Sequence, residues 1–249
     1  MSGPGEIAGW PKLVLTYRTN PETLAELLPP GIMPGAEPLV QMGVYCVPVR
    51  DEPEYGVSTK VMADFDGISG WYSLGMGIDQ ESAIFISQEL NGQPKFPCDI
   101  TYFLHGDRVE ARCTHQGYTF MEFSGTVSGS VEPTGEDVES NEWWIKSIRA
   151  IGGVEGSFDY PPHVVRVRMV SELVSTQTLD GSLRLLDSPW DPHTRYLPMQ
   201  ELVSAELTMS RHKARDITNA GPLDPIAFWP YADVIGGSRW PGERGGPKP

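Results

Sequence analysis

Lys95 is the residue of this 249-residue sequence whose surroundings most suggest chemistry. It stands between Pro94 and Phe96, and Pro97 and Cys98 follow, so its setting is apolar and conformationally restricted. Burying an amine disfavours its protonated form, which lowers its pKa and leaves free base able to attack a carbonyl carbon. The alternative is a lysine whose stem crosses a sheet edge while its ammonium group reaches water. Local context alone favours that alternative.

Other common catalytic motifs are missing from the sequence. A serine-hydrolase elbow needs glycine two residues before and two residues after the nucleophile, and Ser69 and Ser128, which come nearest, lack this spacing. A dinucleotide-binding loop needs G-x-G-x-x-G, and Gly75-Met76-Gly77 has no third glycine. The five histidines are isolated, so a metal site would have to be assembled from distant segments. We therefore predict no metal and no cofactor.

Two charged clusters have plainer interpretations than a binding site. An acidic run is expected to be a solvated loop leading into a helix. Its members are Glu132, Glu136, Asp137, Glu139 and Glu142. A basic cluster is expected to be a surface patch, for example at a subunit contact. Its members are Arg211, His212, Lys213 and Arg215.

Composition and charge exclude several classes of protein. The chain has 19 Lys and Arg against 33 Asp and Glu, a formal net charge of −14, and such an acidic surface disfavours nucleic-acid binding. A hydrophobic fraction of 39% argues against disorder. Because the start lacks a signal-peptide pattern and no run reaches about 18 apolar residues, we expect a soluble, cytoplasmic protein without a membrane partner. The three cysteines lack CxxC spacing, so we expect reduced, mostly buried thiols.

Turn residues divide the chain into short segments, which favours a strand-rich domain. Asn20 and Pro21 predict the start of a helix that Pro29 ends, and NEWWIKSIRA (141–150) is the best candidate for a second helix. Residues 71–86 fit either strands or a helix after Asp79. Alternating or apolar segments predict strands at 38–49, 58–65, 99–104, 107–113, 117–128 and 164–170. We predict an α+β fold dominated by antiparallel sheet, with one domain over residues 1–249 and a frayed tail from about residue 238.

Beyond the lysine, the chain resembles the acetoacetate decarboxylase family over roughly residues 13–235. The motifs that carry the resemblance are YRTNP (17–21), LLP (27–29), EPLV (37–40), F-x-G-x-x-G-x-Y (65–72), E-x-A-I (81–84), E-L-x-x-x-P-K (89–95) and GSLRLLDSPWDPHTRYLPMQELV (181–203). Any one of them alone is weak, but together they are specific. The stretch from Phe65 to Lys95 matches without a gap.

The resemblance implies an antiparallel cone or barrel, a homo-oligomer, and a Schiff base between Lys95 and a ketone or keto acid. Acetoacetate decarboxylase is itself the standard example of such an activated lysine. Several decarboxylase residues are replaced, however. The lysine after the nucleophile is Phe96, and the arginine at the start of the E-L motif is Gln88. The two acidic positions fall on Gly43 and on or near Gly56, and the upstream arginine falls near Trp10. Glu54 substitutes for the second carboxylate if the loop shifts by two residues.

These departures favour a lyase of the aldolase-dehydratase branch, in which the lysine imine of pyruvate or a related 2-oxo acid gives a nucleophilic enamine or undergoes the reverse cleavage or hydration. Candidate proton-transfer or positioning residues are Glu89, Glu81, Gln88 and Tyr72, and candidate substrate-binding residues are Phe96, Trp71 and Glu54. The many aromatic residues suggest an aromatic or apolar aldehyde as the second substrate. Two alternatives stay open: a decarboxylase of another β-keto acid, and a catalytically idle family member that binds an apolar ligand.

Overall fold

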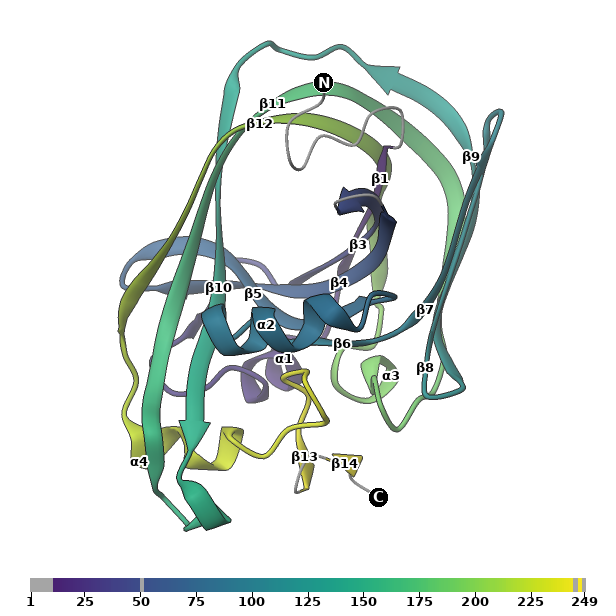
Figure 1. Ribbon diagram of the computed structural model, residues 1–249. Helices are drawn as coiled ribbons and strands as arrows, with labels where there is room; N and C mark the ends of the chain where they lie inside the picture. Colours follow the sequence, from purple (N-terminus) through teal and green to yellow (C-terminus); the bar gives the residue numbers. More distant parts are fainter. Residues whose placement is uncertain (1–10, 50–51, 244–245, 248–249) are drawn as a thin grey trace.

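A large curved sheet that closes on itself dominates the molecule (Figure 1). The computed structural model describes residues 11–49, 52–243 and 246–247. The strands that form the closed ring are β5 (Ile68–Ile78), β4 (Glu52–Phe65), β3 (Leu39–Val49), β1 (Lys12–Arg18), β12 (Glu201–Pro222), β11 (Phe158–Leu185) and β10 (Asp137–Arg149), in that order around it. The ring closes because β10 pairs with both β5 and β11.

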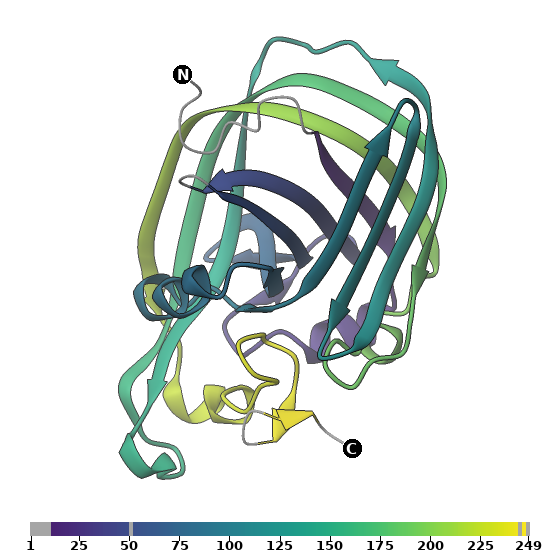
Figure 2. The same ribbon diagram turned by 45° about the vertical axis from the view of Figure 1, so that its right-hand side comes forward.

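A second group of strands extends the sheet beyond the ring. The far part of β11 pairs with β9 (Tyr118–Val131), which continues into β8 (Arg108–His115) and β7 (Asp99–His105). This part of the sheet curves round beside β1 and β3 (Figure 2). Two short strands complete it: β2 (Met33–Pro34) pairs with β4, and β6 (Lys95–Pro97) runs parallel to β5. Apart from β5–β6 and β5–β10, the described pairings in this sheet are antiparallel, as predicted.

The helices are few and short. They are α1 (Pro21–Glu26), α2 (Ser82–Asn91), α3 (His193–Tyr196) and α4 (Pro225–Phe228), with 3-10 turns at Ile151–Gly153 and Trp229–Tyr231 and a small hairpin of β13 (Gly242–Glu243) and β14 (Gly246–Pro247). Within the described ranges, no helix is long and apolar enough to cross a membrane. The first predicted helix is confirmed: the Asn20 side chain accepts from the backbone N–H groups of Glu22 and Thr23.

The predicted helix at 141–150 is wrong, because this segment lies in strand β10. Trp143 and Ile145 point into the main core, whereas Trp144 packs in a second, smaller apolar cluster with Met76 and Val167. A strand buried on both faces has no polar side, so its apolar residues imitate a helical stripe. The uncertain stretch 71–86 divides between β5, which ends at Ile78, and α2, which begins at Ser82.

The end of the chain also differs from its prediction. Ser238 and Trp240 are 1% and 0% exposed, and Trp240 belongs to the main core, so the chain does not fray at residue 238. A tryptophan ring buries enough apolar area to anchor a segment whose composition is otherwise that of a flexible end. Trp10, the position expected for the upstream arginine, lies outside the described residues.

Candidate active site

Strand β6 places the Lys95 side chain inside the ring of strands. Lys95 pairs with Met76 of β5, its carbonyl oxygen accepts from Nε2 of Gln88 at 2.6 Å, and its side chain is 11% exposed. Gly237 passes directly over this strand: a Cβ there would lie 1.9 Å from the Lys95 carbonyl oxygen. Backbone on both sides therefore fixes the strand that carries the amine.

The amine opens onto a cavity of about 570 Å³. One part of its wall is apolar and consists of Met76, Trp144, Val167 and Met169. The charged residues that line it are Lys12, Lys60, Lys95, Arg215, Glu54 and Glu142. Four basic groups face two acidic ones, so this cavity is basic although the chain as a whole carries a net charge of −14. Such a cavity suits an anionic ligand with an apolar part.

Glu54 of β4 is the carboxylate nearest to the Lys95 amine. Its Oε2 lies 3.9 Å from Lys95 Nζ, which is longer than a hydrogen bond, and both side chains are largely buried. Burial lowers the pKa of Lys95; the charge of Glu54 opposes this shift, and Arg215 adds to it. Burial likewise raises the pKa of Glu54 against the effect of Lys95. Both pKa shifts thus favour the uncharged form of the group, which is the free-base amine for Lys95 and the carboxylic acid for Glu54.

The second carboxylate, Glu142 of β10, is fully engaged by its neighbours. It forms a close ion pair with the Lys60 ammonium group and accepts from Ser73 Oγ at 2.6 Å and Trp144 Nε1 at 2.5 Å. Burial alone would raise the pKa of Glu142, but the Lys60 charge and these hydrogen bonds hold it below its usual value. The surroundings of Glu142 therefore favour its ionised form, which links β10 to β4 and β5 at the cavity wall. The Lys60 amine is held in this ion pair.

Gly43 and Gly56 stand at or near the positions where the family resemblance implies carboxylates, and other side chains fill the space beside them. A Cβ at Gly43 would lie 2.3 Å from Cε of Lys12, and one at Gly56 would lie 2.1 Å from Cζ of Tyr45. Residues two apart on a strand share a face, so Glu54 points to the same side of β4 as position 56. The substitution expected for Glu54 thus needs no irregular loop: β3 and β4 stay in regular register from Tyr45–Gly56 to Val47–Glu54.

The other predicted site residues lie away from the Lys95 amine. Glu81 and Glu89 are exposed on or beside α2, and Gln88 is bound to backbone. The Phe96 ring points to the opposite side of β6 and stacks on His115, with centroids 4.4 Å apart. Tyr72 is buried beside a different cavity, where burial raises its pKa to about 12. Trp71 is not among the residues that line the Lys95 cavity.

One residue of the acidic run was placed wrongly, whereas the residues of the basic cluster are exposed, as expected of a surface patch. Glu142 is 4% exposed within a strand, not part of a solvated loop. On β12, Arg211 and Lys213 form surface ion pairs with Glu172, whereas His212 and Arg215 line the cavity. Alternation along the strand could have separated His212 from Arg211 and Lys213, but not Arg215. The pairing of β12 with β11 shifts between Ser171–His212 and Val170–Ala214, and this irregularity changes which residues of β12 face the cavity.

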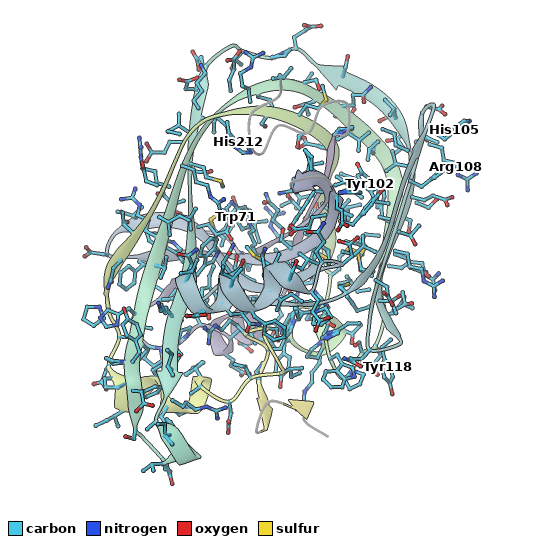
Figure 3. The ribbon with its side chains drawn as sticks, viewed as in Figure 1. Trp71, Tyr102, His105, Arg108, Tyr118 and His212 are labelled. Atoms are coloured by element: carbon cyan, nitrogen blue, oxygen red, sulfur yellow. The ribbon has the colours of Figure 1, made fainter. Side chains whose placement is uncertain are left out.

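Histidines do not gather into a metal site in the part of the chain that the structure describes. No three His, Cys, Asp or Glu side chains there lie close enough together to hold a metal ion. His105 stands on the outer β7–β8 hairpin, far from His212 on β12 (Figure 3).

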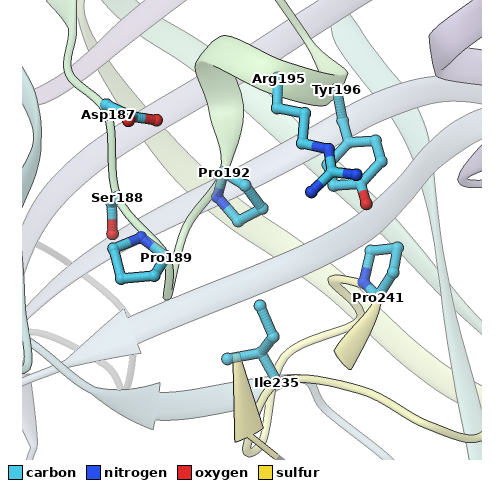
Figure 4. A pocket seen from close by; sticks show the side chains of 8 residues that line it. All are labelled: Asp187, Ser188, Pro189, Pro192, Arg195, Tyr196, Ile235 and Pro241. Carbon is cyan, nitrogen blue, oxygen red and sulfur yellow. The ribbon is translucent and has the colours of Figure 1, made fainter. Parts of the chain in front are cut away.

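A separate cavity of about 320 Å³ lies beside α3 and the end of the chain (Figure 4). Two of its polar groups already have partners: Ser188 Oγ accepts from the backbone N–H groups of Trp190 and Asp191, and Asp187 accepts from Thr194. It holds no lysine, so the chemistry is expected in the Lys95 cavity.

Comparison with known proteins agrees with this geometry. A family model described as acetoacetate decarboxylase (ADC) matches residues 3–220. The chain belongs to the acetoacetate decarboxylase family. A curated acetoacetate decarboxylase from Burkholderia ambifaria (strain MC40-6) is 24% identical over 228 residues, which cover 87% of this chain and 86% of that one.

Solved structures share the family's fold. A structure described under "Structural Studies of Acetoacetate Decarboxylase" has a TM-score of 0.75 at 18% identity, covering 89% of this chain and 91% of the other. The enduracididine biosynthesis enzyme MppR, complexed with pyruvate, has a TM-score of 0.64 at 16% identity, covering 83% and 87%. MppR has also been solved with the condensation product of pyruvate and imidazole 4-carboxaldehyde. The predicted fold is confirmed: an α+β acetoacetate decarboxylase-type barrel.

Proposed function

We propose that the protein is a lyase that joins Lys95 to a 2-oxo acid such as pyruvate as a Schiff base, and uses the resulting enamine in aldol condensation and dehydration or in the reverse reactions. The observation that carries the proposal is the Lys95 amine, buried in a basic cavity beside Glu54, where burial lowers its pKa. Family membership and the two MppR complexes add support.

In this mechanism the free-base Nζ of Lys95 adds to the keto carbon, and the hydroxyl of the adduct leaves as water to form the iminium. Glu54 as the acid protonates that hydroxyl, and as the carboxylate it removes a proton from the neighbouring carbon, whose electron pair becomes the enamine double bond. The enamine carbon adds to an aldehyde, a second water is lost, and hydrolysis of the imine frees Lys95. Glu54 takes this role in place of Glu81, Glu89, Gln88 and Tyr72 because it lines the cavity 3.9 Å from the Lys95 amine, whereas Glu142, the other carboxylate there, is hydrogen-bonded to Ser73 and Trp144.

The remaining walls suit the two reactants. Arg215, whose charge acts on Lys95, is placed to hold the carboxylate of the keto acid. Met76, Trp144 and Met169 offer an apolar surface to an aromatic or apolar aldehyde. Assembly into a homo-oligomer, which the family resemblance implies, stays a prediction.

The direct test is to trap the imine with the wild-type enzyme. Incubation with pyruvate and sodium borohydride is expected to add the mass of a reduced pyruvate imine, and peptide mapping is expected to find it on Lys95. If no keto acid gives an adduct, the chain is an idle ligand-binding member, and thermal shifts without turnover would be its sign.

Decarboxylation of a β-keto acid is the second candidate, favoured by the curated relatives, which are acetoacetate decarboxylases. The position after the nucleophile argues against it: Phe96 brings no second amine, and its ring turns away toward His115. Release of CO₂ from acetoacetate or a larger β-keto acid by the wild-type enzyme, and not by a Lys95 variant, would establish this activity instead.

Glu54→Gln tests the proton-transfer role. Because the charge of Glu54 raises the pKa of Lys95, its removal is expected to move the half-maximal pH for imine trapping downward, since free base then persists in more acidic solution. Loss of the acid–base group is expected to reduce condensation turnover by about 100-fold or more. The measurements are the pH profile of trapping with pyruvate and the rate of product formation.

The matched control is Glu52→Gln, on the same strand but exposed. It should change neither quantity. If Glu54→Gln leaves the trapping profile and the turnover as in the wild type, Glu54 is not the proton-transfer residue.

A further inference from the structure

The cavity contains two cations beyond those paired with its carboxylates. Lys60 is paired with Glu142, and Lys95 is paired with Glu54 at 3.9 Å. The Lys95–Glu54 pair has no net charge whether the proton they share is on the amine or on the carboxylate. Within residues 11–49, 52–243 and 246–247, neither Lys12 nor Arg215 has a carboxylate within 4.0 Å. Arg215 instead lies over the Trp144 ring, with its Cζ 6.0 Å from the centroid. Lys12 and Arg215 therefore face the cavity without a paired carboxylate among the described residues.

The two cations occupy different places along the cavity. Arg215 comes from β12 and acts electrostatically on Lys95. Lys12 comes from β1, and the charges that act on it are those of Lys60 and Glu142. Partial burial lowers the pKa of His212, which lines the same cavity, and the charges of Arg215 and Lys12 both lower it further. Arg215 is thus the cation near the reactive amine, and Lys12 is the distal one.

Lys12 is half-buried in this distal position. Its Nζ lies 2.8 Å from where a Cβ on Gly43 would be, so the glycine opens the space that the amine fills. Burial and the charge of Lys60 lower the pKa of Lys12 to about 8, although Glu142 opposes the shift. A half-buried ammonium group without a paired carboxylate keeps part of its desolvation cost, and an incoming anion would offset that cost.

We infer that Lys12 binds a second anionic group of the substrate, so that the keto acid is a diacid whose one carboxylate faces Arg215 beside the imine and whose other carboxylate reaches Lys12. The inference rests on the proposed imine chemistry at Lys95. It narrows the substrate class from 2-oxo acids in general to 2-oxo diacids. The two unpaired cations match the two charges of such a ligand.

The test compares two keto acids of equal chain length, 2-oxoglutarate and 2-oxopentanoate, in borohydride trapping on Lys95. The wild-type protein is expected to reach half-saturation at about tenfold lower concentration of the diacid, the effect of one charge-assisted contact. Lys12→Met is expected to remove most of this preference, and Lys12→Arg to retain part of it. Lys213→Met, which removes an exposed charge on β12, is expected to keep the tenfold ratio.

Each outcome has one meaning. If both keto acids trap with equal half-saturation in the wild type, or if Lys12→Met keeps the preference, the diacid inference is wrong while the imine chemistry stands. If neither keto acid traps, the proposed function fails and this inference fails with it. Should Lys12→Met not fold, Lys12→Gln and the wild-type comparison of the two acids still decide the question.

Discussion

Replacing Lys95 by methionine is expected to abolish imine trapping and to reduce turnover by about 10⁴-fold or more, because the covalent step has no substitute. The other two amines in the cavity are poorly placed to take over. Lys60 is held in its ion pair with Glu142, and Lys12 stands at the distal end, outside the groups that act electrostatically on Lys95. The measurements are the intact mass after borohydride reduction with pyruvate and the rate of product formation.

Lys95→Arg is the companion variant. A guanidinium keeps the positive charge but forms no imine with a ketone under these conditions, so this variant is expected to lose trapping as completely as Lys95→Met. Methionine is close to lysine in volume and removes a buried charge, so thermal unfolding should show a folded protein. An adduct that persists on Lys12 or Lys60 in either variant would show that the nucleophile has been assigned to the wrong lysine.

Glu142→Gln is expected to lower the free energy of unfolding by about 3–5 kcal/mol, because it leaves the Lys60 ammonium group buried without a counter-charge. Glu142 is 4% exposed and Lys60 is 8% exposed, so little water reaches the pair to replace the lost partner. The glutamine oxygen can still accept from Ser73 and Trp144, which isolates the effect of the charge. Urea unfolding at neutral pH measures the change.

The double variant Lys60→Met with Glu142→Gln supplies the control. Removing both charges together is expected to recover most of the lost stability, since no uncompensated ion then remains in the core. If Glu142→Gln alone lowers the free energy of unfolding by less than about 1 kcal/mol, the ion pair is better hydrated than its burial indicates, and it does not stabilise the cavity wall.

Strand β10 shows where prediction from the sequence reached its limit. The segment NEWWIKSIRA has a continuous apolar centre, and a continuous apolar run does not distinguish a helix from a strand buried on both faces. The distinction depends on what covers the two faces. Trp143 enters the core, and Trp144 enters the cavity wall. These neighbours come from β5 and β11, which lie far away in the chain.

Some residues of the candidate site were recognisable from the sequence, and others were not. Lys95 was recognisable because an amine among prolines and aromatic residues is a local feature that the family motifs then reinforce. Glu54 was recognisable as a substitute only through a two-residue shift of a loop, whereas the structure places it on β4, one strand period before Gly56. The partners Glu142 and Arg215 were not, because each lies in an ordinary charged stretch, nor was Lys60, whose neighbours in the chain do not show that it meets Glu142.

The sequence alone was sufficient for the strand-rich fold, the family and the lysine, since turn residues, alternation and contiguous motifs are written locally in the chain. Only the tertiary structure decided which charges surround that lysine. Closure of the ring of strands brings β1, β4, β6, β10 and β12 around one cavity and limits the contact of Lys95, Glu54, Lys60 and Glu142 with solvent. Desolvation and the distances between charges are properties of that closed arrangement. They make Lys95 a candidate nucleophile, Glu142 a paired anion and Lys12 an unpaired cation.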